Sequence, residues 1–350
     1  MILDATDRRA LAIVAWIAAL VGFADVLSAR LGLKYVQEVE WPTDLYALQQ
    51  VHRGTRPDVA IIGSSRAHYG LSPSAIDLCL SDALGRRTET LAANRLTAST
   101  YATDIVARDV FGGPAAPRAF VVEVAPESLH AHHFELDYNV ASTAAIQDIP
   151  ECAAVALTGP PALAACARPL LRGVENAAFL LHRGWTDTRH IEWMALYHDG
   201  GQYCFDDDAC RARNQAYDDS HRGRWDARVA KVLPRVTAER FADYAVGTGL
   251  PSAHFVTLLD RARADGAVVF VVNMPVSALY HAQIPPEDQA AWLAWITPTI
   301  AAHGARFLDY DTPEWRDRRD LFLDPDHLNA RGALLLSNAV CAALTADALH

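Results

Sequence analysis

Short apolar runs alternate with amphipathic stretches over two parts of the chain. The apolar runs are rich in Val, Ile and Ala and are bounded by Gly, Pro or polar residues, which is typical of buried strands. The predicted strands are 58–62, 88–93, 117–125, 267–272 and 305–309. The amphipathic stretches predict helices over 72–84, 97–110, 251–264, 286–303 and 328–347.

This alternation of strand and helix is typical of a parallel sheet covered by helices. With right-handed crossovers, the five strands predict an α/β fold with a flavodoxin-like, doubly wound, five-stranded parallel sheet. Sites in such sheets form at the carboxyl ends of the strands, so we expect the chemistry there.

The alternation is interrupted for more than a hundred residues, which are rich in Ala, His, Trp, Arg and Asp and contain no convincing series of strands. We interpret this part as a mainly helical insertion. The expected organisation after residue 30 is a linker over 30–56, a first α/β part over 57–125, the insertion over 126–250 and a second α/β part over 251–350.

The amino terminus has a different pattern. Residues 10–29 form an apolar stretch that contains Asp25 as its one charge and follows two arginines. It is long enough for a short transmembrane anchor, with residues 1–9 in the cytoplasm. The alternative is a cleaved signal peptide, because Gly22-Phe23-Ala24 has small residues at the spacing that precedes a cleavage point. Both interpretations place the remaining chain outside the cytoplasm, on the periplasmic or cell-surface side.

Composition and cysteine content narrow the function. The formal net charge of -11 argues against nucleic acid as a partner, because phosphate binding needs clustered Lys and Arg. The six cysteines are an even number, as expected for disulfides in an oxidising compartment. Cys204 and Cys210 bracket a short polar loop, and Cys152 and Cys166 form a second plausible pair. Neither pair has the spacing of a zinc site, and we expect no metal or cofactor.

Two separate segments carry candidate catalytic residues. Ser65 follows the first strand in Ile61-Ile62-Gly63-Ser64-Ser65, where a tight turn would expose its hydroxyl above the sheet. Asp324 and His327 lie three residues apart across a turn that contains proline. A carboxylate in contact with an imidazole fixes its tautomer and stabilises the imidazolium, as a serine nucleophile requires. Each segment alone has a structural interpretation, as a turn or as a helix cap.

Together, the two segments resemble the SGNH, or GDSL-type, hydrolase family. In that family the nucleophilic serine follows the first strand and an Asp-x-x-His block lies near the carboxyl terminus, which Ser65, Asp324 and His327 match in order and separation. The amino-terminal segment and the Gly-Ser-Ser sequence look closest to the exported branch that includes the D-alanyl transfer protein DltD and the alginate O-acetylation proteins. That branch handles acyl groups on cell-envelope polymers, often beside a membrane-bound O-acyltransferase.

The chain departs from the family pattern around the oxyanion hole. The end of the second strand has Asn94 where the family has Gly, and the third strand ends in Glu123-Val124-Ala125 where an Asn is usual. Asn94 is therefore a candidate oxyanion donor, and Asn273, which ends the fourth strand, is a candidate for lining the pocket or simply for ending the strand. Arg66 would bind an anionic substrate or, as we favour, form an ion pair with Glu123.

The insertion offers one further cluster. His130, His132 and His133 lie close together in sequence, but no additional ligand falls at a spacing that completes a metal site, so we expect a solvated loop.

The sequence thus predicts an exported, membrane-tethered serine esterase or O-acyltransferase that acts on acyl groups of a polysaccharide or polyol. Hydrolysis and transfer would use the same residues, so both remain open. The alternative is a non-catalytic scaffold or polymer-binding subunit of an envelope acylation complex, which the altered oxyanion segments would permit.

Overall fold

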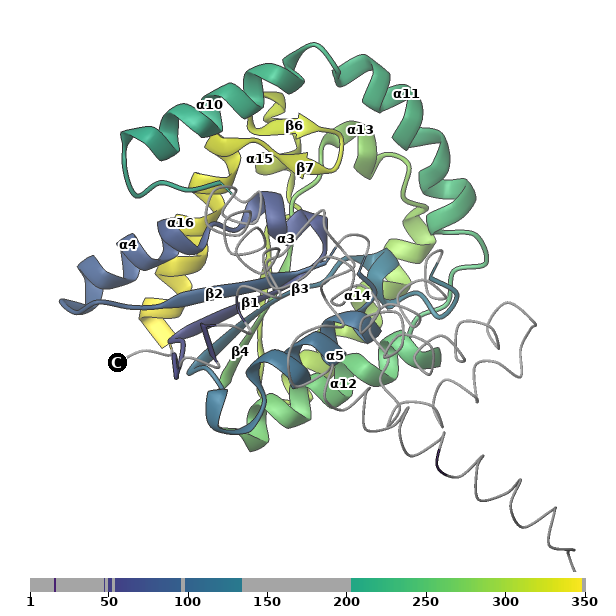
Figure 1. Ribbon diagram of the computed structural model, residues 1–350. Coiled ribbons are helices and arrows are strands. Elements are labelled where there is room, and N and C mark those ends of the chain that lie inside the picture. Colours follow the sequence, from purple (N-terminus) through teal and green to yellow (C-terminus); the bar gives the residue numbers. More distant parts are fainter. Residues whose placement is uncertain are drawn as a thin grey trace, which may run out of the picture.

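The computed structural model of the chain describes residues 54–95, 98–133 and 203–347, together with positions 16, 47, 50 and 51. Its centre is a five-stranded, all-parallel sheet with the strand order β2-β1-β3-β4-β5 (Figure 1). The strands are β1 (Val59–Gly63), β2 (Thr90–Asn94), β3 (Ala119–Glu123), β4 (Val268–Asn273) and β5 (Arg306–Asp309). The predicted fold class, strand number and doubly wound order are confirmed.

Helices cover both faces of the sheet, as the apolar strands require. Successive strand residues point to opposite faces, so Ile61 packs in one core and Ile62 in the other. The core around Ile62 is closed by α5 (Thr100–Phe111), α12 (Gly249–Ala264) and α14 (Pro286–Ala302). The core around Ile61 is closed by α4 (Pro73–Leu84) and α16 (Ala330–Asp347) (Figure 1). Each of these five helices begins or ends within a few residues of its predicted bounds.

The sequence signals at helix ends act as expected. The Ser72 hydroxyl accepts a hydrogen bond from the backbone N–H of Ala75, and Pro73 occupies the first turn of α4. Gly85 ends that helix in a left-handed conformation with φ +62°.

Several short elements were not predicted. The main ones are α3 (Ser65–Gly70), which begins at the candidate nucleophile, and an antiparallel hairpin of β6 (Phe322–Asp324) and β7 (His327–Leu328). Elements of two to six residues are too short to show a period in the sequence. The others are α13 (Ala278–His281), α15 (Pro313–Arg316), η2 (Gly113–Ala115), η3 (Pro126–Leu129) and η7 (Arg319–Leu321).

The described end of the insertion is helical, as predicted. It contains α10 (Asp208–Arg222), α11 (Trp225–Arg235) and the π-helical turn η6 (Val236–Arg240). These elements arch above the β6–β7 hairpin, which they contact (Figure 1). The insertion therefore contributes to the same end of the sheet as the candidate site. Residues 134–202 of the predicted insertion lie outside the described residues.

Two disulfides join described residues. The predicted pair Cys204–Cys210 is present. The second disulfide, Cys79–Cys341, links α4 to α16 and was not predicted, because packing brings together cysteines that are 262 residues apart in sequence. The suggested pair Cys152 and Cys166 lies outside the described residues.

The candidate anchor over 10–29 also lies outside the described residues, except for Trp16. Among the helices that the structure describes, none combines the length and the apolar character needed to cross a membrane.

Candidate active site

A tightly packed turn presents Ser65 at the carboxyl end of β1. A side chain at Gly63 would place its Cβ 2.6 Å from the Cβ of Glu123 and 2.8 Å from that of Ala67, so only glycine fits. The next backbone N–H, that of Ser64, donates to Oε2 of Glu123 at 2.6 Å. The Ser64 hydroxyl caps α3 by accepting from the Arg66 N–H at 3.2 Å. Ser65 is thus held as the first residue of α3.

The β6–β7 hairpin brings His327 and Asp324 to this turn. Nε2 of His327 lies 2.9 Å from Oγ of Ser65, and Nδ1 lies 2.8 Å from Oδ1 of Asp324. An ionised carboxylate only accepts, so Nδ1 carries the proton and the neutral imidazole accepts at Nε2 from the Ser65 hydroxyl. The Tyr69 ring contacts the imidazole edge-on, with 5.0 Å between ring centroids. The three predicted residues meet at the spacing that a serine–histidine–aspartate triad requires.

Backbone groups of the hairpin fix Asp324. Its Oδ1 also accepts from the backbone N–H groups of Asp326 at 3.1 Å and His327 at 3.0 Å. The carboxylate is buried, so these donors replace the water that it would otherwise bind.

The surroundings of His327 make it more basic than usual. Burial by itself would lower its pKa, but the negative charges of Asp324 and Asp326, together with the hydrogen bond to Asp324, outweigh burial and raise the pKa above 6.5.

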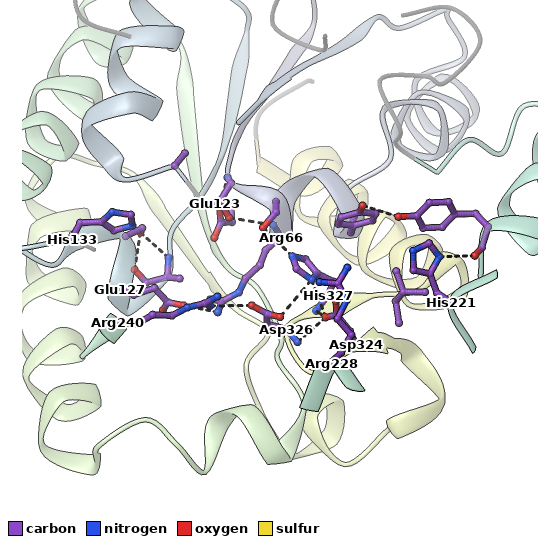
Figure 2. A pocket seen from close by; sticks show the side chains of 18 residues that line it. Arg66, Glu123, Glu127, His133, His221, Arg228, Arg240, Asp324, Asp326 and His327 are labelled. Carbon is purple, nitrogen blue, oxygen red and sulfur yellow. Dashed lines mark hydrogen bonds and ion pairs between the residues drawn. The ribbon is translucent and has the colours of Figure 1, made fainter. Parts of the chain in front are cut away.

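A buried polar network extends from His327 to Arg66. Asp326 accepts from Arg240 at 3.0 Å, Arg240 donates to the Tyr280 hydroxyl at 2.7 Å, and that hydroxyl donates to Oε1 of Glu127 at 2.6 Å. Arg66 donates to the same Glu127 oxygen at 2.5 Å (Figure 2). The expected ion pair of Arg66 with Glu123 is therefore wrong in its partner. The long Arg66 side chain reaches past the end of β3 to Glu127 in η3. Spacing along the sequence does not reveal this contact.

A cavity of about 300 Å³ opens beside Ser65. Its lining comes from the turn after β1, from the segment that follows β3, from the arch of α10, α11 and η6, and from the hairpin. The described lining residues are Ser64, Ser65, Arg66, Tyr69, Ala98, Glu123, Ala125, Glu127, Ser128, His133, Tyr217, His221, Arg228, Arg240, Leu323, Asp324, Asp326 and His327 (Figure 2).

The two asparagine candidates lie outside this lining. Asn94 is fully buried at the end of β2, where it pairs in register with Gly63. Asn273 donates from its side chain to Asp309 at 2.8 Å and so ties the end of β4 to that of β5. The structure therefore gives Asn273 the role of a strand end rather than of a pocket residue.

Glu123 takes a position that sequence reasoning did not assign to it. It is buried and lines the cavity. Burial raises its pKa, although Arg66 and the hydrogen bond from Ser64 oppose the shift. Its Oε1 has no hydrogen-bond partner in the described part of the chain. The signal for this residue was its place at a strand end, next to Gly63 in the turn that holds Ser65.

The histidine cluster is a solvated loop at His132 only. His130 and His133 are both buried, and burial lowers the pKa of His133 to about 3. Nε2 of His130 donates to the backbone carbonyl of Ala242 at 3.0 Å, and Nδ1 accepts from the backbone N–H of Ala245 at 3.1 Å. The prediction failed because the returning chain after η6 covers this segment. His133 therefore enters the cavity wall as a neutral side chain.

Tyrosines form the wall below the arch. The hydroxyls of Tyr69 and Tyr217 are 2.7 Å apart, and their rings stack. Tyr203 packs against both rings and donates to Asp218 at 2.6 Å. This cluster joins α10 to α3, so the arch has a fixed position relative to Ser65.

Asp324, Asp326 and His327 also have ligand atoms within 4.8 Å of one another, close enough to share a metal ion. In this arrangement both nitrogens of His327 already contact protein groups, Ser65 and Asp324, and Asp326 forms an ion pair with Arg240. The geometry therefore favours proton transfer over metal binding.

Comparison with models of known protein families and with curated protein sequences gives no match to the chain. The site therefore combines a serine hydroxyl in contact with an imidazole, a carboxylate that orients the imidazole, and an adjacent cavity.

Proposed function

We propose that this protein is an exported serine esterase or O-acyltransferase of the SGNH type. The observation that carries the proposal is the continuous contact from Ser65 to His327 to Asp324, which joins segments 262 residues apart in the sequence. Neither segment needs the other for a turn or a helix cap, so a purely structural role does not account for their meeting.

In this proposal the Ser65 hydroxyl attacks the carbonyl carbon of an acyl ester while His327 removes its proton at Nε2. Asp324 stabilises the imidazolium that forms. His327 then returns the proton to the leaving alcohol, and an acyl-Ser65 ester remains. In the second half, water or an acceptor hydroxyl gives its proton to His327 and attacks that ester. His327 then returns the proton to Oγ of Ser65, which leaves the acyl carbon, and an acid or a new ester is released.

The oxyanion of each tetrahedral intermediate needs hydrogen-bond donors. The backbone N–H of Ser65 is at the start of α3, where helical N–H groups have no acceptor within the helix. With Asn94 outside the cavity lining, this N–H is the principal donor that we assign among the described residues.

The expected setting is the outer face of a membrane. The candidate anchor over 10–29 and the two disulfides support this location. The resemblance to the exported SGNH branch supports an acyl-bearing polysaccharide or polyol as substrate and a membrane-bound O-acyltransferase as partner. Water and a polyol hydroxyl would compete for the same acyl-enzyme. Adding glycerol to an ester-hydrolysis assay therefore measures the balance between hydrolysis and transfer.

A fluorophosphonate probe tests the proposal, because it reacts covalently with activated serines. Wild-type protein should be labelled on the peptide that contains Ser65, and Ser65→Ala should remove the label. The matched control is Ser81→Ala, since Ser81 hydrogen-bonds to Thr88 just before β2, at the opposite end of the sheet. If folded wild-type protein reacts no faster than Ser65→Ala, the enzyme proposal fails and the scaffold function is favoured.

A further inference from the structure

A second carboxylate competes for the ring nitrogen that Asp324 binds. Oδ1 of Asp326 lies 3.5 Å from Nδ1 of His327, compared with 2.8 Å for Oδ1 of Asp324. The other oxygen of Asp326, Oδ2, is bound by Arg240 at 3.0 Å. The position of Asp326 therefore depends on a cation that comes from the end of the insertion.

From this geometry we propose that Arg240 is a positioning residue for His327. By binding Asp326, Arg240 keeps the second carboxylate off the imidazole, reserves Nδ1 for Asp324 and limits the negative charge that His327 meets. The inference deepens the proposed function and rests on it for its meaning in catalysis, but its effect on His327 can be measured without any substrate.

Arg240 is well placed for this role because it is held on several sides. Its guanidinium donates to the Tyr280 hydroxyl at 2.7 Å and lies over the same ring, 5.5 Å from the centroid. Glu127 approaches it at 3.7 Å. The side chain is 18% exposed and that of Asp326 is 6% exposed, so water screens their interaction only weakly.

The charges on Asp326 and Arg240 are both maintained. Burial by itself would raise the pKa of Asp326, but His327, Arg240 and Arg66 outweigh burial and hold the pKa below its ordinary value. Burial by itself would lower the pKa of Arg240, but Tyr280, Asp326 and Glu127 outweigh burial and raise it. The pair therefore acts as a fixed dipole beside the imidazole across the working pH range.

The other groups that face His327 come from three elements, β6, α3 and α11. Asp324 on β6 is its hydrogen-bond acceptor, Ser65 and Tyr69 on α3 contact its ring, and Arg66 on α3 opposes its protonation. Arg228 on α11 reaches Oδ2 of Asp324 at 4.0 Å, but its side chain is 43% exposed, so solvent screens it. Arg240 differs from these groups in acting through Asp326.

The test is an NMR titration of the His327 imidazole in Arg240→Met, Asp326→Asn and the double variant. Arg240→Met should raise the pKa of His327 by about one unit, because the freed Asp326 carboxylate moves toward Nδ1. Asp326→Asn should lower the pKa by a similar amount. In the Asp326→Asn background, Arg240→Met should have little further effect. Arg240→Lys keeps the charge and should stay near wild type.

The matched control is Arg235→Met, because Arg235 pairs with Glu239 at the surface near the same turn. In each variant, the pH at which fluorophosphonate labelling slows on the acidic side should shift together with the pKa of His327 measured by NMR. Failure of all labelling in wild type would overturn the proposed function, while the titration would still decide the inference. An unchanged His327 pKa in folded Arg240→Met, or a shift that persists in the double variant, overturns the inference.

Discussion

Asp324 provides a sharp test of how the site works, because its Oδ1 accepts from three donors. These are Nδ1 of His327 and the backbone N–H groups of Asp326 and His327. The two backbone donors require an oxygen at this position. In Asp324→Asn, the amide oxygen should therefore face them, and its NH₂ group should take the place of Oδ2. The amide oxygen would still accept from Nδ1, so the variant should lose the charge and keep the orientation of the imidazole.

The size of the effect follows from the loss of charge. A hydrogen bond to a charged group contributes about 1.5–3 kcal/mol and a neutral one about 0.5–1.5 kcal/mol. The difference of about 1–2 kcal/mol corresponds to a rate loss of about 5- to 30-fold. Asp324→Ala loses orientation as well as charge, and its loss should approach about 10⁴-fold, as for removal of the carboxylate from other serine triads.

The assay is the second-order rate constant of fluorophosphonate labelling at a pH where His327 is neutral. Circular dichroism and thermal unfolding check that both variants fold. The reasoning about the backbone donors is refuted if folded Asp324→Asn is as slow as Asp324→Ala. Equal rates for all three proteins would remove Asp324 from the proposed mechanism.

Three further predictions concern stability, measured by urea unfolding. Gly63→Ala should cost about 1–3 kcal/mol through overpacking against Glu123, whereas Gly223→Ala, with open space around it, should be near neutral; equal effects would contradict the packing argument. Burial raises the pKa of the Asp77 carboxyl to about 6, so the folded state holds this proton more tightly than the unfolded chain does. As pH rises from about 4 to 6, the free energy of unfolding of the wild type should therefore fall by up to about 3 kcal/mol relative to that of Asp77→Asn. A difference in unfolding free energy that does not change with pH would refute this. Replacing both cysteines of the Cys79–Cys341 disulfide with serine should cost about 2–5 kcal/mol, more than removing the disulfide of the short loop, and the reverse order would contradict the loop-length argument.

The turn after β1 shows how far local sequence reasoning reaches. An apolar strand followed by Gly63-Ser64-Ser65 indicated a serine at a strand end with its hydroxyl exposed above the sheet. In the structure Ser65 lies at that strand end, but it is half-buried in the cavity lining. The sequence did not reveal why glycine is required. The reason is the Cβ of Glu123, which lies 2.6 Å from where a Gly63 Cβ would stand, and register between strands is not encoded in local spacing.

The oxyanion and pocket candidates show where motif reasoning fails. Asn94 was chosen because it stands where the family has its oxyanion glycine, and Asn273 because it ends a strand. A strand end can face the cavity or the neighbouring strand. Asn273 faces Asp309. The polar residues that do line the cavity with Ser65 include Glu127 and Arg240, which lie in η3 and η6 and belong to no motif.

The sequence by itself determined the five strands, the principal helices and the identity of Ser65, Asp324 and His327, because strand and helix periods and turn chemistry are local properties. Tertiary structure alone decided that these residues meet, that Arg66 pairs with Glu127, and that Cys79 reaches Cys341. These contacts join positions brought together by sheet order and helix packing. Their energies depend on distance and burial, which no spacing along the chain specifies.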